Sequence, residues 1–113
     1  MTKANKFDTI TNMKNEQRMV IVAFRGFSGI YSMIQGCHAV VEFAAQFGDT
    51  DEYRKWQKRH KTIFVLESHS SNQLEEAFTE LKKLKVPVSK FIEPDINDSV
   101  TAIAFLIGEG VWN

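Results

Sequence analysis

Apolar residues recur along the chain with two different periods, and this alternation divides the sequence into strands and helices. Residues 19–24 (MVIVAF) form a continuous apolar run that is too short for a helix and rich in β-branched side chains. Such a run predicts a central strand buried on both faces. After a turn at residues 25–29, apolar residues return at helical spacing and predict the longest helix, which ends near Gly48. Its apolar stripe consists of Ile30, Met33, Ile34, Cys37, Val41 and Ala44.

The segment that follows is polar and leads into a second strand. Residues 51–60 predict a short helix or an extended connection. Tyr53 and Trp56, three residues apart, are expected to anchor this segment to the body of the protein. Residues 62–66 then predict a strand.

A second amphipathic helix and two further strands complete the chain. Ser70 and Gln73 have the spacing of a capping box, and three lysines near the other end suit a helix C-terminus. Pro87 permits a strand to start, so residues 88–92 predict a short strand and residues 101–107 a strongly apolar one. The apolar stripe of the helix consists of Leu74, Ala77, Phe78, Leu81 and Leu84.

The predicted order, β-α-(α)-β-α-β-β, is typical of an α/β domain. Helical connections favour parallel neighbouring strands, and the short last link favours an antiparallel pair. We therefore expect a four-stranded mixed β-sheet flanked by helices. The 113 residues contain no internal repeat or linker, which indicates a single domain at residues 18–113. Residues 1–17 are expected to be a flexible N-terminal leader, because they are polar and lack the apolar stretch of a secretory signal.

Composition indicates the class of protein and its cellular location. A hydrophobic content of 43% with 25% charged residues is typical of a soluble globular protein. No apolar run approaches the roughly 20 residues that span a bilayer, so no membrane partner is expected. Cys37 is the single cysteine, which excludes an internal disulfide and favours a cytoplasmic location.

Charge indicates that any RNA binding is local. Fourteen basic residues balance fourteen acidic ones, so the whole chain has no general attraction to nucleic acid. The best local candidate is the stretch 53–61, whose Lys55, Lys58 and Arg59 are interleaved with aromatic rings. The same composition describes a solvated helix pinned by its aromatic residues, and that interpretation is favoured for the stretch taken alone.

One face of the long helix carries polar side chains. Tyr31, Gln35, His38 and Glu42 are four, three and four residues apart and therefore lie on one ridge beside the apolar stripe. Taken alone, such a ridge is more often the boundary between core and solvent than a site.

A second polar group follows the third predicted strand. Glu93 and Asp95 flank Pro94 in a strand-end loop, the place where α/β domains usually carry reactive groups. Their carboxylates could orient a water molecule. Asn97, Asp98 and Ser99 are interpreted as ordinary turn residues.

The remaining candidates are assigned no chemistry. Cys37 lies on the apolar stripe, which predicts that it is buried as a small hydrophobic residue. Gly26 and Gly29 precede a helix but lack the rest of a phosphate loop. His60 and His69 have no partners at a metal-binding spacing, so no metal is expected.

Several segments together resemble the type II peptidyl-tRNA hydrolase family. They are the strand ending at Arg25, the helix segment 35–39 (QGCHA), and the late segments 91–95 (FIEPD) and 101–104 (TAIA). Their order and spacing cover roughly residues 18–107. The ending is similar to that of a divergent bacterial and phage-type branch.

The resemblance implies hydrolysis of the ester that joins a peptide to the terminal ribose of tRNA, usually by a homodimer and without a metal or organic cofactor. Such chemistry needs a positioned water, donors for the tetrahedral oxyanion and cations for the RNA. The resemblance places Arg25 near the RNA. In a hydrolase of this kind, Glu93 or Asp95 would position the water, Gln35 and His38 would stabilise the developing charge, and Tyr31 would be an added hydroxyl donor.

The sequence departs from the family's pattern at its best-known functional positions. Family members carry a lysine four residues before the helix glutamine, and Tyr31 here removes that permanent cation. They also carry an aspartate after the third strand and a threonine four residues on, where Glu93 and Asn97 are the nearest matches. A divergent or degenerate hydrolase therefore competes with a non-catalytic domain that binds RNA or a protein partner. A small dimer that senses a metabolite is a third alternative, for which no ligand motif is present.

Overall fold

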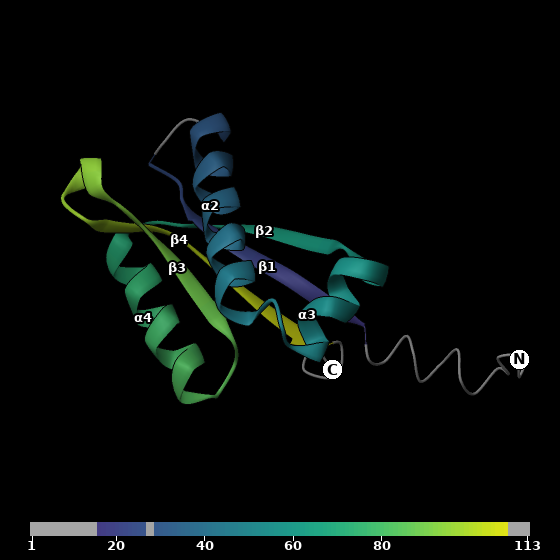
Figure 1. Ribbon diagram of the computed structural model, residues 1–113. Helices are drawn as coiled ribbons and strands as arrows, with labels where there is room; N and C mark the ends of the chain where they lie inside the picture. The colour runs from purple at the N-terminus through teal and green to yellow at the C-terminus, as the bar shows by residue number, and fades with distance from the viewer. Residues whose placement is uncertain (1–15, 27–28, 109–113) are drawn as a thin grey trace, which may run out of the picture.

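The computed structural model describes residues 16–26 and 29–108, and it confirms the predicted order of elements. Residues 51–60 adopt the helical alternative, as a short α-helix followed by a π-helical turn. The predicted leader lies outside the described residues except for its last two positions, and the first strand begins at Gln17. The elements, labelled in part in Figure 1, are β1 (Gln17–Phe24), α2 (Gly29–Phe47), α3 (Asp51–Lys55), η1 (Trp56–His60), β2 (Thr62–Ser68), α4 (Ser71–Lys83), β3 (Val88–Glu93), η2 (Pro94–Ile96) and β4 (Ser99–Gly108).

The four strands form the predicted mixed sheet, in the order β2-β1-β4-β3. β1 is parallel to β2, to which helices connect it, and antiparallel to β4. β3 and β4, joined by a short link, are antiparallel. The two most apolar strands, β1 and β4, are therefore central, whereas β2 and β3 form the edges.

The helices cover both faces of the sheet, because successive strand side chains point to opposite sides. On one face, Met19 and Ala23 of β1 pack with Phe43 of α2 and with Trp56. On the other face, Leu74 of α4 packs with Ile103 of β4. The result is a three-layer arrangement with α2 and α4 on opposite sides of the sheet.

The segment α3–η1 is anchored as predicted. Trp56 is buried, and its indole Nε1 donates a hydrogen bond of 2.8 Å to the backbone oxygen of Thr62. Tyr53 packs against the same core cluster. These two rings hold a polar helical segment near the start of β1, which leaves its basic side chains exposed.

The start of α4 is capped by Ser70, whose Oγ accepts a hydrogen bond of 3.1 Å from the backbone nitrogen of Gln73. The Gln73 side chain accepts from the backbone nitrogen of His69 at 2.9 Å, one residue earlier than in an ideal capping box. Leu84 follows the end of the helix and is 72% exposed, so it does not extend the buried stripe.

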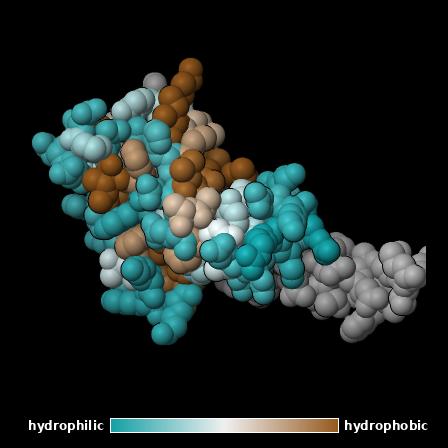
Figure 2. Space-filling model, viewed as in Figure 1, coloured by the Kyte–Doolittle hydropathy of each residue, from teal (hydrophilic) through white to brown (hydrophobic). Residues whose placement is uncertain are grey.

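The orientation of α2 is the main difference from the sequence-based expectation. The buried residues of α2 are Gln35, Gly36, Ala39 and Phe43. The predicted apolar stripe faces away from the sheet, and Figure 2 shows its hydrophobic side chains gathered over the helix. The prediction that Cys37 is buried is therefore wrong, because this residue lies on the exposed stripe. The exposed members of the stripe are Ile30, Met33, Ile34, Cys37 and Val41.

Side-chain size explains this orientation. α2 carries a second set of small or apolar residues at helical spacing, which includes Gly36, Ala39 and Phe43. Gly36 lies so close to the sheet that a Cβ atom there would be 2.7 Å from Cγ2 of Ile21. The small residues allow the helix backbone to approach β1, whereas the bulkier stripe would hold it away.

Candidate active site

The polar ridge of α2 and the strand-end loop meet through Gln35 and Glu93. Nε2 of Gln35 donates a hydrogen bond of 3.2 Å to Oε2 of Glu93. Gln35 is 1% exposed, whereas Glu93 at the end of β3 is half-buried. Two of the predicted site residues, 58 positions apart in sequence, thus lie together at the carboxyl end of β3.

Thr101 completes a buried polar chain and was not predicted as a site residue. Its Oγ1 donates a hydrogen bond of 2.7 Å to Oε1 of Gln35, and the side chain is 1% exposed. Glu93 as a carboxylate only accepts hydrogen bonds, so Gln35 must turn its NH₂ group toward Glu93 and its oxygen toward Thr101. The available signal in the sequence was the presence of one hydroxyl residue in the otherwise apolar segment 100–107.

A β-bulge aims Thr101 at the helix. Phe91 pairs with Ala102 and Ile92 pairs with Val100, so Thr101 is an extra residue on β4. The side chains of Thr101 and Ala102 both lie on the α2 face of the sheet as a result. Bulges often redirect a side chain next to a site, and this one supplies the donor that orients Gln35.

The second oxygen of Glu93 is held by the loop. Oε1 accepts a hydrogen bond of 3.3 Å from the backbone nitrogen of Asp95, and this contact caps the short turn η2. Asn97 and Asp98 then adopt positive φ angles of 52° and 56°, which lets the chain reverse into β4. The interpretation of Asn97 and Asp98 as turn residues is confirmed, whereas that of Ser99 is wrong, because Ser99 is the first residue of β4.

The other members of the α2 ridge remain exposed. His38 stacks on Phe91 of β3, with 4.4 Å between the ring centroids and 19° between the planes. Tyr31 is 36% exposed one turn before Gln35, and Glu42 is exposed one turn after His38. The ridge is therefore a boundary between core and solvent in which only Gln35 is buried.

Asp95 and Arg25 lie near this end of the sheet, but their side chains do not join the hydrogen-bonded chain. The Asp95 side chain is exposed and forms no hydrogen bond or ion pair within residues 16–26 and 29–108. Arg25 follows β1, and its backbone nitrogen donates to the oxygen of Ser68 at 3.0 Å. The Arg25 side chain is exposed.

The predicted RNA-binding residues of the 53–61 stretch form a separate basic cluster, which we define as Lys55, Lys58 and Arg59. Together with Asp51 and Arg54 they line a shallow depression of about 400 Å³. The cluster lies near the start of β1, beyond the C-terminal end of α2. Along α2, the rise from Gln35 to Phe47 is about 18 Å at 1.5 Å per residue, so the cluster and Glu93 occupy opposite ends of the sheet.

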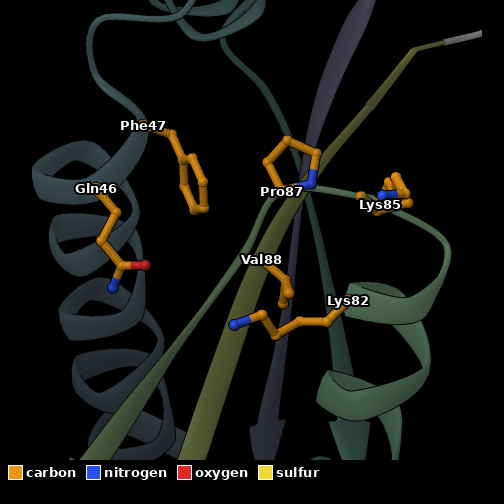
Figure 3. Close-up of a pocket in the computed structure, with 7 residues that line it drawn as sticks. Gln46, Phe47, Lys82, Lys85, Pro87 and Val88 are labelled. Carbon is orange, nitrogen blue, oxygen red and sulfur yellow. The ribbon is translucent and has the colours of Figure 1, made fainter.

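A further pocket of about 250 Å³ lies at the start of β3 (Figure 3). Phe47 and Pro87 form part of its wall, and the ammonium group of Lys82 reaches across it. None of the predicted site residues lines this pocket, and none of the described residues that line it carries a carboxylate. Its residues offer no general base for hydrolysis.

In the part of the chain that the structure describes, no three His, Cys, Asp or Glu side chains are grouped so that they could hold a metal ion. None of the helices formed by these residues has both the length and the apolar character needed to cross a bilayer.

Comparison with known proteins gives one family match. The sequence model of the family described as "Peptidyl-tRNA hydrolase PTH2" matches residues 31–107, which include the α2 ridge, Glu93 and Thr101. No curated protein sequence matches the chain.

Proposed function

Because the chain belongs to the PTH2 family of peptidyl-tRNA hydrolases, we propose that it hydrolyses the ester between a peptide and the terminal ribose of tRNA, with Glu93 as the general base. The observation that carries this proposal is the buried chain Thr101–Gln35–Glu93. It holds one half-buried carboxylate in a fixed orientation at the carboxyl end of a strand.

Glu93 has the geometry of a base that activates water. Each carboxylate oxygen accepts one protein hydrogen bond, from Gln35 and from the backbone of Asp95, and each retains further acceptor capacity. A water bound there can give a proton to the carboxylate while its oxygen attacks the ester carbonyl carbon. Collapse of the tetrahedral intermediate then breaks the bond to the ribose oxygen, which takes up the proton.

Gln35 and Asp95 have different supporting roles in this proposal. Gln35 is 1% exposed, so it acts as a positioning residue for Glu93 and does not touch the substrate. Asp95 contributes its backbone nitrogen to Glu93, while its exposed carboxylate is not needed to orient the water. Glu93 is accordingly favoured over Asp95 as the base.

Tyr31 is the proposed donor to the oxyanion. It is exposed, and it lies one turn before Gln35 on the same ridge. A phenol hydroxyl can donate a hydrogen bond to the negative charge that develops on the carbonyl oxygen. It carries no charge of its own, which makes it a weaker electrostatic partner than the lysine that the family's pattern has at this position.

Two basic regions would hold the RNA. Arg25 lies at the same end of the sheet as Glu93, near the proposed position of the ester. The basic cluster lies at the other end and exposes three cations around a shallow depression. A tRNA that places its 3′ end at Glu93 and runs along α2 would bring backbone phosphates to this cluster.

We also propose that the protein is a homodimer formed through the edge strand β2. Four consecutive apolar side chains of this strand, Ile63 to Leu66, are 38–53% exposed, which is unusual for an unprotected edge. Antiparallel pairing of the full strand with a second copy centres on Val65 and sets Glu67 opposite Ile63 of the second copy.

The hydrolase proposal is tested by cleavage of peptidyl-tRNA with purified protein. Glu93→Gln keeps the size and one acceptor oxygen but removes the base, and it should lower kcat by about 10²- to 10⁴-fold. Asp95→Asn is the matched control and should leave kcat within a few-fold of the wild type. If the wild type does not cleave the substrate but binds RNA in a salt-dependent manner, the hydrolase assignment is wrong and the non-catalytic alternative holds.

A further inference from the structure

His38 and Phe91 form a second contact between the α2 ridge and β3, next to the proposed base. The rings are stacked at 4.4 Å with an interplanar angle of 19°. His38 is exposed and forms no hydrogen bond or ion pair with the residues that the structure describes. One face of the imidazole therefore rests on Phe91, and the ring extends the aromatic surface toward solvent.

The Gln35–Glu93 and His38–Phe91 contacts follow one another along α2 and β3. His38 follows Gln35 by one turn of α2, and Phe91 precedes Glu93 by two residues on the same face of β3. Residues two apart on a strand are separated by about 7 Å. The stacked rings thus lie about the length of one nucleoside from the carboxylate that is proposed to act on the ester.

We propose that the His38–Phe91 stack binds the terminal nucleobase of the tRNA, and this inference rests on the proposed function. The base would stack on the exposed face of the imidazole, and the attached ribose would then place its ester at Glu93. Histidine is one of the side chains on which unpaired bases of single-stranded RNA stack. The site takes a planar heterocycle, and for this substrate the base is adenine.

The geometry favours stacking over a donor role for His38. The imidazole N–H bonds lie in the plane of the ring, and that plane is nearly parallel to the ring of Phe91. The face offered to a ligand is consequently the π-surface of the ring. A stacking role requires an aromatic ring at position 38, whereas an oxyanion donor requires a ring nitrogen.

Substitutions at position 38 separate these roles in full-length protein. His38→Ala should raise KM for peptidyl-tRNA about tenfold, since removal of a stacking ring weakens binding of one base by roughly 5- to 150-fold, while kcat changes less than about threefold. His38→Phe should recover most of the lost affinity without any N–H donor. Glu42→Ala, one turn further along the ridge, is the matched control and should leave both constants unchanged. Equal losses in His38→Ala and His38→Phe, or a fall in kcat at constant KM, would overturn the proposal.

A substrate with an abasic terminal nucleotide provides the complementary measurement. The wild type should discriminate against it about tenfold in kcat/KM, and His38→Ala should lose most of this discrimination. The same preference in wild type and His38→Ala would show that the base does not contact this ring.

Binding without hydrolysis is measured by NMR of the full-length Glu93→Gln variant. Titration with the trinucleotide CCA should shift the His38 ring protons upfield, and the same addition to His38→Phe should shift the protons of the new ring. The chemical shifts can be measured even if the wild type does not cleave peptidyl-tRNA. Failure of the hydrolase proposal can therefore be distinguished from failure of the stacking proposal. Unchanged His38 resonances at saturating trinucleotide would refute the stacking site itself.

Discussion

Thr101 and Gln35, 66 positions apart in sequence, share a buried hydrogen bond of 2.7 Å that fixes the direction in which the Gln35 amide points. The bond exists because an extra residue in β4 turns the Thr101 side chain to the α2 face of the sheet. It allows Gln35 to present its NH₂ group to Glu93. The bulge between β3 and β4 therefore determines the orientation of Glu93, the proposed catalytic carboxylate.

Removal of the Thr101 hydroxyl should break the hydrogen-bonded series that joins Thr101, Gln35 and Glu93. Thr101→Val keeps the side-chain shape but leaves the buried Oε1 of Gln35 without its donor, so the free energy of unfolding should fall by about 1–3 kcal/mol. Hydrolysis should slow through kcat, because Glu93 is held less firmly. Thr101→Ser retains the hydroxyl and should behave more like the wild type in urea denaturation and in kinetics. Equal effects of the two substitutions would contradict a role for the hydroxyl.

The close approach of α2 to the sheet should make Gly36 intolerant of a side chain. Gly36→Ala places a Cβ atom 2.7 Å from Cγ2 of the buried Ile21, and such overpacking costs about 1–3 kcal/mol. Gly29→Ala is the matched control, because nothing lies within 4 Å of a Cβ atom there. Thermal unfolding should show a lower Tm for Gly36→Ala alone. A stabilised Gly36→Ala would mean that helix propensity outweighs the contact and that α2 packs less closely.

RNA binding should depend on the position of the positive charges that are removed and not only on their number. The double reversal Lys55→Glu/Lys58→Glu should weaken tRNA binding and reduce the dependence of log Kd on log salt by about 0.7–0.9 per lost phosphate contact. Lys82→Glu/Lys83→Glu changes the net charge equally on α4 and should have a smaller effect. Fluorescence anisotropy at several salt concentrations measures both the affinity for tRNA and its dependence on salt. Similar losses in the two variants would indicate general electrostatic attraction instead of a site at the basic cluster.

A charge in the middle of β2 should dissociate the proposed dimer. Val65→Lys places ammonium groups of two copies against each other at the centre of the strand pair, and light scattering after gel filtration should report a monomer. Val41→Lys introduces the same charge on the exposed stripe of α2 and should leave the dimer intact. Dissociation by Val41→Lys with a stable Val65→Lys dimer would place the interface on α2. A monomeric wild type would refute the homodimer.

The sequence by itself determined the secondary elements, the mixed sheet and the two groups of polar residues. The central strands were predictable because residues 19–24 are apolar throughout and residues 101–107 are apolar except for Thr101, as expected of strands covered on both faces. The cap at Ser70 was predictable because its side chain bonds to the backbone three residues further on. The turn at Asn97 and Asp98 was predictable because these residue types tolerate positive φ angles. The residue pattern identified Glu93 and Gln35 as separate candidates, and the family resemblance assigned them to one site.

Only the tertiary structure decided which face of α2 is buried and how the candidates meet. Periodicity identifies apolar positions, and α2 has two apolar sets. The set that is buried depends on how closely the helix approaches β1, where a Cβ atom at position 36 would lie 2.7 Å from Cγ2 of Ile21. This choice exposed Cys37 and buried Gln35. The role of Thr101 depends on the register shift between β3 and β4. This shift is a property of the strand pair and cannot be predicted from the sequence of either strand alone.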